Sequence, residues 1–306
     1  MLDTHCHIQF SAYKDDADEV IKRCVEKNVI LNAVGSQRDT SARAVEYAGK
    51  YDNIYATVGL HPIHLFKSRV DEAEAKFESR EEEFDYEYYK KLAKNKKVIA
   101  IGECGLDFFH LPKGVGGEEV LKKQKEIFLA QYNLAKELGL PLVIHVREAH
   151  EEMIGLLRYL VIPSEQSDEE SLSKNTTDRN PSHAFGMTKS TIRGVIHCYT
   201  SNWEIAEQYL DLGLYLGFTG VITFPPKKTD PQTQLDLLEV VEKCPLERML
   251  VETDAPYLAP QAYRGQRCEP WMVEEVAKKI AEIKGVPEEA VLNKTTENAK
   301  KLFKIS

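Results

Sequence analysis

Short apolar runs alternate with amphipathic stretches along the whole chain. Eight of these runs are rich in Val, Ile and Leu, which is typical of strands buried on both faces of a parallel sheet. The eight predicted strands are residues 2–7, 29–35, 54–60, 97–103, 140–146, 193–199, 214–220 and 248–254.

Helical patterns lie between these runs, with apolar residues spaced three and four positions apart. Clear examples are residues 15–28, 118–139 and 202–213. Eight alternations of strand and helix predict a (β/α)8 barrel of the TIM type, forming a single domain over residues 1–306. An open doubly wound sheet is the alternative, but it usually has fewer strands and a glycine-rich first turn, which is not visible here.

Two polar segments interrupt the alternation. Residues 71–87 carry nine acidic and two basic side chains, and we expect them to form the solvent-facing side of a helix. Residues 163–190 are polar and rich in Ser, Asn, Asp and Glu, and we expect a poorly ordered insertion between the fifth and sixth strands.

Composition and charge restrict the possible functions. The chain has no run of about 18 apolar residues, so we expect no membrane span, and we expect no signal peptide before the first strand. Its six cysteines form no CxxC pair, which favours a reducing cytoplasm. A net charge of −9 disfavours non-specific coating of nucleic acid, so a nucleic-acid substrate would need a local basic patch or a bound cation.

Histidines and acids gather at the ends of the predicted strands. In a barrel of this kind, active-site groups lie at the C-terminal ends of the strands. Side chains two residues apart on a strand point the same way, so the first strand presents two imidazoles on one face. The strand-end side chains that could bind metal are His5, His7, Glu103, His145, His197 and Asp254.

Imidazole and carboxylate together form a ligand set for divalent metals at hydrolytic sites. Because one carboxylate can bridge two cations roughly 3.5–4 Å apart, the set suits a pair of ions. The first ion would be held by the two histidines of the first strand with Asp254, and the second by His145 and His197, with Glu103 between them. Asp254 could also orient or deprotonate the attacking water. Asp254 and Glu103 are therefore the predicted catalytic residues. The alternative for Asp254 is that its side chain caps the following turn. Zn, Mg, Mn, Ni and Fe all remain possible cofactors.

Seven motifs in order carry a family resemblance over nearly the whole chain. They are DTHCH, GLHP, IGECGLD, IHVREA, IHCYTS, ETDAPYLAP and YRGQRCEPWMV. The sequence thereby resembles the TatD-type metal-dependent deoxyribonucleases of the amidohydrolase superfamily. The resemblance implies a TIM-type barrel that hydrolyses phosphodiester bonds with divalent metals, and its ligand positions fall on the six residues above. Cys268 and Glu148 depart from the usual family residues, which concerns substrate preference and leaves the metal ligands intact.

Four further residues are candidates for substrate contact. His61 in GLHP is predicted to face the substrate or support a ligand, and not to bind metal itself. The guanidiniums of Arg147, Arg264 and Arg267 are candidates for phosphate binding, because a planar fork matches phosphate oxygens. With the activity that the resemblance implies, the predicted substrate is DNA bound locally at the metals, with no membrane partner and no obligate protein partner.

Three functional hypotheses follow from these observations. The first is a two-metal phosphodiesterase acting on DNA ends or single strands. The second keeps the metals but cleaves another bond, such as an amide, a lactone or an aminoacyl ester. Many superfamily relatives of that kind bridge their metals with a carboxylated lysine on the fourth strand, where this chain has Glu103. The third is a non-catalytic scaffold that binds nucleic acid or protein, against which the complete ligand set argues.

Overall fold

Each of the eight predicted apolar runs forms a strand, and the strands pair in sequence order as one parallel sheet. The computed structural model describes residues 1–67, 69–71, 76–161 and 192–305, so the predicted insertion at 163–190 lies outside the described residues. The strands of the sheet are β1 (Leu2–Cys6), β2 (Ile30–Val34), β3 (Ile54–Val58), β6 (Val98–Asp107), β7 (Leu142–Arg147), β8 (Gly194–Ile196), β9 (Tyr215–Phe218) and β10 (Met249–Val251).

The chain closes this sheet by joining the segment after β10 to the end of β1. Cys6 and Ala255 form a parallel bridge, and the His7 N–H donates to the Ala255 carbonyl at 2.7 Å. The Asp254 N–H donates to the His5 carbonyl at 2.9 Å. The predicted (β/α)8 barrel is therefore confirmed, and the same closure brings the first and last strand ends into contact.

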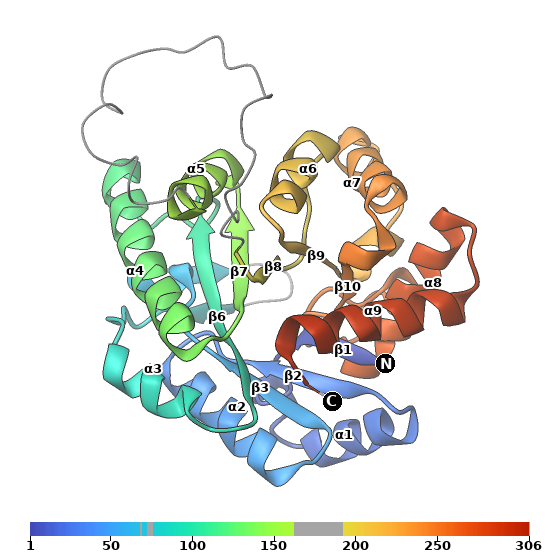
Figure 1. The fold of residues 1–306 in the computed structure, drawn as a ribbon, viewed down its shortest axis with the longest axis horizontal. Helices are drawn as coiled ribbons and strands as arrows, with labels where there is room; N and C mark the ends of the chain where they lie inside the picture. Colours follow the sequence, from blue (N-terminus) through green and yellow to red (C-terminus); the bar gives the residue numbers. More distant parts are fainter. Residues whose placement is uncertain (68, 72–75, 162–191, 306) are drawn as a thin grey trace, which may run out of the picture.

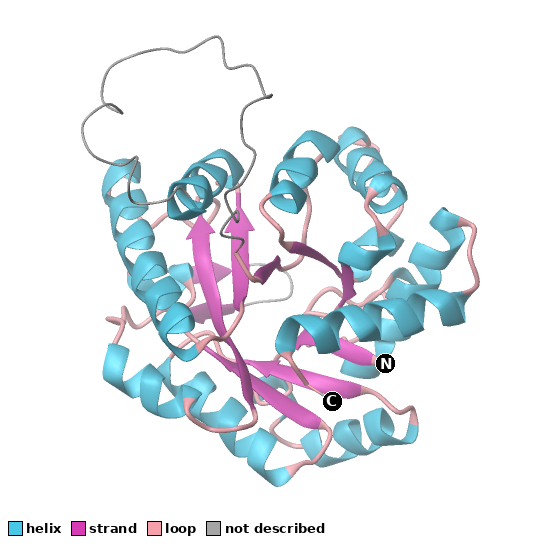
Figure 2. Ribbon diagram, viewed as in Figure 1, coloured by secondary structure: helices cyan, strands magenta, loops and turns pink. Residues whose placement is uncertain are grey.

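Helices surround the barrel, as Figures 1 and 2 show. The predicted helices at 15–28, 118–139 and 202–213 are confirmed within a few residues as α1, α4 and α6. The 22-residue α4 is capped at its C-terminus by Gly139, whose φ of 65° is a left-handed conformation that glycine adopts without strain. The helices are α1 (Ala17–Glu26), α2 (Arg38–Lys50), α3 (Tyr86–Ala93), α4 (Gly117–Leu138), α5 (His150–Val161), α6 (Trp203–Asp211), α7 (Gln232–Lys243), α8 (Val273–Lys284) and α9 (Glu288–Phe303).

The two ends of the barrel differ. At the N-terminal ends of the strands, the last turns of α9 place Leu302 and Phe303 in an apolar cluster with Leu2 and Leu250. Burying such side chains stabilises the fold and seals this end against water. The polar strand ends therefore gather at the opposite, C-terminal end.

The prediction of a helix over residues 71–87 is wrong. Two short strands, β4 (Arg69–Asp71) and β5 (Lys76–Glu78), pair antiparallel there, and the helix α3 starts only at Tyr86. A high density of acidic residues indicates contact with water, but it does not distinguish a helix from a strand. Among the described residues, no helix has both the length and the apolar character needed to span a membrane.

Candidate functional site

The six predicted metal ligands converge at the C-terminal end of the barrel. His5 lies in β1 and His7 directly after it, while Glu103 lies within β6. His145 comes from β7, and His197 follows the end of β8. Asp254 lies in the turn after β10 that closes the barrel, so five strands contribute to one centre.

One group of side chains forms around the turn after β10. Oδ1 of Asp254 lies 3.3 Å from Nε2 of His7 and 3.8 Å from Nε2 of His5. The same oxygen lies 3.7 Å from Nε2 of His197, whose ring stacks on that of His5 with 3.5 Å between centroids. Three imidazole nitrogens thus surround a single carboxylate oxygen.

Glu103 stands between this group and a second one. Its Oε2 lies 3.4 Å from Nε2 of His5, while its Oε1 lies 3.1 Å from Nδ1 of His145 and 3.4 Å from Nε2 of His61. His197 also approaches Oε1, at 4.0 Å from its Nε2. The two oxygens of one buried carboxylate therefore face two different sets of imidazoles.

Two of the histidines have their ring orientation fixed from outside the centre. Nδ1 of His7 lies 2.7 Å from the Val34 carbonyl, which can only accept, so this nitrogen carries the proton. Nδ1 of His197 lies 2.8 Å from Oε1 of Glu252, a fully buried carboxylate. In both rings Nε2 is left to face the centre, which is the arrangement that orients histidine ligands in metal proteins.

His145 is held by a further buried acid, Asp107 at the end of β6. Oδ2 of Asp107 lies 3.1 Å from Nε2 of His145 and 2.8 Å from Nδ1 of His110. The other oxygen accepts from the His110 backbone N–H at 2.8 Å. Gln124 of α4 fixes the backbone here, because its amide pairs with both the N–H and the carbonyl of Asp107.

The turn that carries Asp254 is fixed by Asp3 of β1. Asp3 is fully buried and accepts hydrogen bonds from the Thr253 hydroxyl at 2.6 Å and the Thr253 N–H at 2.9 Å. Asp254 itself has a φ of 59°, a left-handed conformation that is uncommon outside glycine. Asp3 therefore helps to hold this conformation, and with it the position of the Asp254 carboxylate.

The carboxylates of the centre are held in their charged form. Burial alone would raise the pKa of Glu103, but the imidazoles of His61 and His5 hold it well below its usual range. Burial would also raise the pKa of Asp254, yet the hydrogen bond from His7 and the nearby imidazoles lower it. The centre is therefore negatively charged unless cations balance it.

Two histidines respond in the opposite direction. Burial would lower the pKa of His145, but its contacts with Asp107 and Glu103 raise it to about 9. Burial would likewise lower the pKa of His197, but Glu252 beside its Nδ1 raises it to about 10. Without metal, protons on the His145 and His197 rings therefore offset the negative charge of the carboxylates. Bound metal ions would supply that positive charge instead, so the acids and imidazoles form an environment suited to cations.

The donor set fits divalent metals. Both ring nitrogens of His5 are buried and have no hydrogen-bond partner, which is costly unless another group satisfies them. Imidazole nitrogens and carboxylate oxygens are ligands of Zn²⁺ and related ions. Three sets of potential ligand atoms lie within 4.8 Å of one another among the described residues: His5–His7–Asp254, His61–Glu103–His145 and His5–His197–Glu252.

The four predicted substrate contacts have different surroundings. His61 lies at the centre beside Glu103, which adds it to the candidate ligands, while Arg147 lies at the end of β7 with its guanidinium 3.8 Å from the ring centroid of Phe109. Arg264 is exposed in the loop after β10. Arg267 forms a bidentate ion pair with Asp16, in which Nη1 and Nη2 donate to the two carboxylate oxygens at 2.9 and 2.6 Å. Both of these guanidinium nitrogens already have a partner within the protein.

Asp107 and Glu252 are the parts of the site that sequence reasoning missed. Each lies an even number of residues along the strand from a predicted ligand, at 103 and 107 and at 252 and 254. Side chains at such spacings share a face of a strand. The same alternation that selected the two histidines of β1 could therefore have selected both acids.

Comparisons with known proteins match the whole length of the chain. The family model described as TatD related DNase matches residues 2–304. The uncharacterized metal-dependent hydrolase YabD of Bacillus subtilis is 35% identical over 309 residues, covering 100% of both chains. The 3'-5' ssDNA/RNA exonuclease TatD of Cronobacter sakazakii is 30% identical, covering 99% of this chain and 97% of the relative. The crystal structure of YJJV, a TatD homolog from Escherichia coli, superposes with a TM-score of 0.76 at 24% identity and covers 100% and 98% of the two chains.

Proposed function

The chain belongs to the TatD-related DNase family of metal-dependent hydrolases, and from this premise we propose that it is a phosphodiesterase that hydrolyses nucleic acid with two divalent metal ions. The preferred substrate in this proposal is single-stranded DNA, attacked from an end. The six sequence-predicted ligands hold the ions, and His61 is close enough to Glu103 to join them.

The observation that carries the proposal is the position of Glu103. One of its oxygens faces His5 at 3.4 Å and the other faces His145 at 3.1 Å, as a carboxylate must if it is to bridge two ions. When bound, divalent ions lower the pKa of water toward 7 and neutralise charge that develops on the phosphorus oxygens. His5, His7 and Asp254 would hold one ion, and His145 and His197 the other.

Asp254 is the proposed general base. Its carboxylate is ionised, is 18% exposed, and lies among three imidazole nitrogens. A group that accepts a proton from the attacking water must be both charged and reachable, and Asp254 satisfies both conditions. Glu252 and Asp107 stay behind the imidazoles of His197 and His145 and keep those rings in place.

The net charge of −9 is compatible with a nucleic-acid substrate if attraction is local. Cations at the centre and the guanidinium of Arg147 would attract phosphate only near the scissile bond. The name of the Cronobacter sakazakii relative, a 3'-5' ssDNA/RNA exonuclease, supports single strands as the substrate class. A cytoplasmic location and the lack of an obligate protein partner stay predictions from the sequence.

The test compares substrates on metal-reconstituted protein. End-labelled single-stranded and duplex DNA would be assayed beside ester and amide substrates, and the metal content would be measured on protein purified without chelator. We expect shortening of single-stranded DNA from one end and about two ions per chain. Cleavage of amides or aminoacyl esters alone would support the second hypothesis, and absence of metal together with absence of any cleavage would support the scaffold.

A further inference from the structure

We propose that Phe109 and Arg147 form a nucleobase subsite beside the metal centre, where the base of a substrate nucleotide stacks while its phosphate reaches the metals. This inference rests on the proposed phosphodiesterase function and extends it to the recognition of the base. The pair consists of a half-exposed aromatic ring and a guanidinium whose carbon lies 3.8 Å from the ring centroid.

The barrel itself brings the two residues together. Arg147 is the last residue of β7, and its register partner in β6 is Asp107, two residues before Phe109. The Phe108 N–H continues this pairing beyond β6 by donating to the Arg147 carbonyl at 2.9 Å. Arg147 therefore extends from the end of a paired strand, and Phe109 from the bend that follows the partner strand directly. A residue on a strand can position a ligand more accurately than one on a free loop.

The pair lies next to the candidate metal ligands. His145 precedes Arg147 by two residues on β7, so the two side chains leave the same face of the strand. Asp107 contacts both His145 and His110, and the ring of His110 meets that of Phe109 edge-on at 4.9 Å. A chain of direct contacts thus connects a metal ligand to the aromatic ring.

Phe109 is 48% exposed, whereas the other phenylalanines whose burial the structure describes are half-buried or buried. Aromatic rings at a single-strand binding site accept any base, because every base has a flat face that can stack. Arginine adds to such a site in two ways: its guanidinium plane stacks on bases, and its charge attracts the adjacent phosphate. The Arg147–Phe109 pair offers both properties at the C-terminal ends of β6 and β7, beside the candidate ligand His145.

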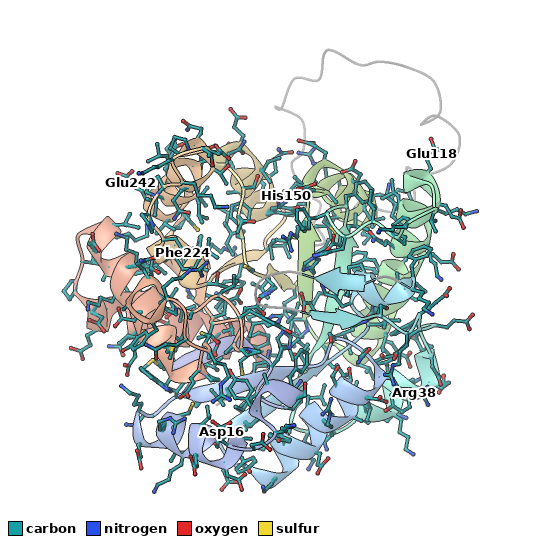
Figure 3. The ribbon with its side chains drawn as sticks, turned by 180° about the vertical axis from the view of Figure 1, so that it is seen from behind. Asp16, Arg38, Glu118, His150, Phe224 and Glu242 are labelled. Atoms are coloured by element: carbon teal, nitrogen blue, oxygen red, sulfur yellow. The ribbon has the colours of Figure 1, made fainter. Side chains whose placement is uncertain are left out.

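A second guanidinium–aromatic pair provides a direct comparison. Arg264 lies over Phe224 with 4.3 Å to the ring centroid, and Phe224 follows the short helical turn after β9 (Figure 3). The ring of Phe109 is connected to the candidate ligand His145 through His110 and Asp107. Because of this connection to the centre, we assign the base subsite to Phe109 and use Phe224 for comparison.

The experiment separates stacking from catalysis by changing the ring and the base independently. Phe109→Leu removes the ring but keeps an apolar side chain, and Phe109→Trp keeps an aromatic face. Each variant would be assayed on a single-stranded oligonucleotide and on the same oligonucleotide with abasic residues at both ends. The control is Tyr159→Leu, which removes an aromatic ring that is 65% exposed on α5.

We expect Phe109→Leu to raise KM about tenfold on the normal oligonucleotide, with kcat changed less than twofold. On the abasic oligonucleotide, the wild type and Phe109→Leu should have equal KM values. Tyr159→Leu should behave like the wild type on the two substrates, and Phe109→Trp should keep a lower KM on the normal oligonucleotide than on the abasic one. Equal effects of Phe109→Leu on both substrates, an effect on neither, or an effect only in Phe224→Leu would overturn the assignment.

A binding measurement keeps this inference distinct from the proposed function. Indole fluorescence of the Phe109→Trp variant would be followed with dAMP and with deoxyribose 5-phosphate, which lacks the base. The wild type, which carries Trp203 and Trp271, gives the background to subtract. Additional quenching by dAMP alone supports the subsite even if no oligonucleotide is cleaved, in which case only the proposed reaction fails. Cleavage without base-dependent quenching overturns the subsite and leaves the proposed reaction standing.

Discussion

Nδ1 of His197 lies 2.8 Å from Oε1 of Glu252, and this buried contact fixes which nitrogen of the ring faces the candidate metal centre. The same carboxylate accepts from the Cys198 N–H at 2.6 Å and from the Thr4 hydroxyl at 3.1 Å. Two hydrogen-bond donors thus hold Glu252, one from the segment after β8 and one from β1. These bonds position the carboxylate beside Nδ1 of His197, so the folded chain itself orients the ring.

Replacing Glu252 should therefore weaken metal binding without unfolding the protein. In Glu252→Gln, the negative charge beside Nδ1 of His197 is lost, and an amide nitrogen replaces one of the two acceptor oxygens. We expect metal affinity to fall about 10- to 100-fold, as it does when the orienting partner of a histidine ligand is lost. Competition with a chromogenic chelator measures the affinity, and circular dichroism checks the fold.

Glu242→Gln is the matched control, since Glu242 is an exposed glutamate at the edge of the molecule (Figure 3). Gly217→Ala tests the same carboxylate from the other side, because a Cβ on Gly217 would lie 2.5 Å from both oxygens of Glu252. The variants Glu252→Gln and Gly217→Ala should both weaken metal binding. If Glu252→Gln binds metal as tightly as Glu242→Gln, the orienting role is wrong.

Asp254→Asn should slow catalysis, because Asp254 is the proposed base and also one of the proposed ligands of the first ion. The amide keeps the size of the side chain but cannot accept a proton from water, so kcat should fall by about two to four orders of magnitude. The measurement is cleavage of end-labelled single-stranded DNA, with metal content determined on the same preparation. A variant that retains metal and cleaves at the wild-type rate would exclude Asp254 as the base.

The sequence predicted the barrel well because the strands of a closed parallel sheet are continuous apolar runs. The predicted ligands followed from one further rule, that active sites of such barrels lie at the C-terminal strand ends. His5 and Glu103 are 98 residues apart in the sequence, yet this rule placed both at one end of the barrel. The contact between them at 3.4 Å agrees with that reasoning.

The surroundings of the arginines could not be predicted in the same way. Arg267 pairs with Asp16, a residue 251 positions earlier, and no periodicity in the sequence links the two. The acidic segment 71–87 could not be predicted from its composition either. Its many acids indicate contact with water, whereas the pairing of β4 with β5 depends on contacts between the two strands. The local residue pattern therefore does not reveal contacts that depend on a partner elsewhere in the chain.

Removing and restoring metal should change the stability of the fold. Ions that bind only the folded state stabilise it by about 2.7 kcal/mol per site when free metal is 100 times Kd. We expect Tm to rise by several degrees when metal-free protein is reloaded, with about two ions per chain by mass spectrometry.

The double variant His5→Ala/His7→Ala should bind at least one ion fewer and should show a smaller rise in Tm on reloading. A full load of one ion per chain would contradict the two-metal proposal.

Stability should also depend on pH through His150, at the start of α5. Its Nδ1 lies 3.1 Å from the Tyr209 hydroxyl of α6, and burial, with the nearby charge of His145, lowers its pKa from 6.5 to about 4 (Figure 3). Between these two values the unfolded chain binds a proton that the folded protein does not, so stability is complete above pH 6.5 and falls as the pH drops toward 4. At pH 5 the free energy of unfolding should be about 2 kcal/mol lower than at pH 7.5.

Urea unfolding at both pH values, with chelator present, measures this free energy for the wild type and for His150→Gln. The variant should lack this part of the pH dependence, and identical pH profiles for both proteins would show that His150 is not buried in its neutral form.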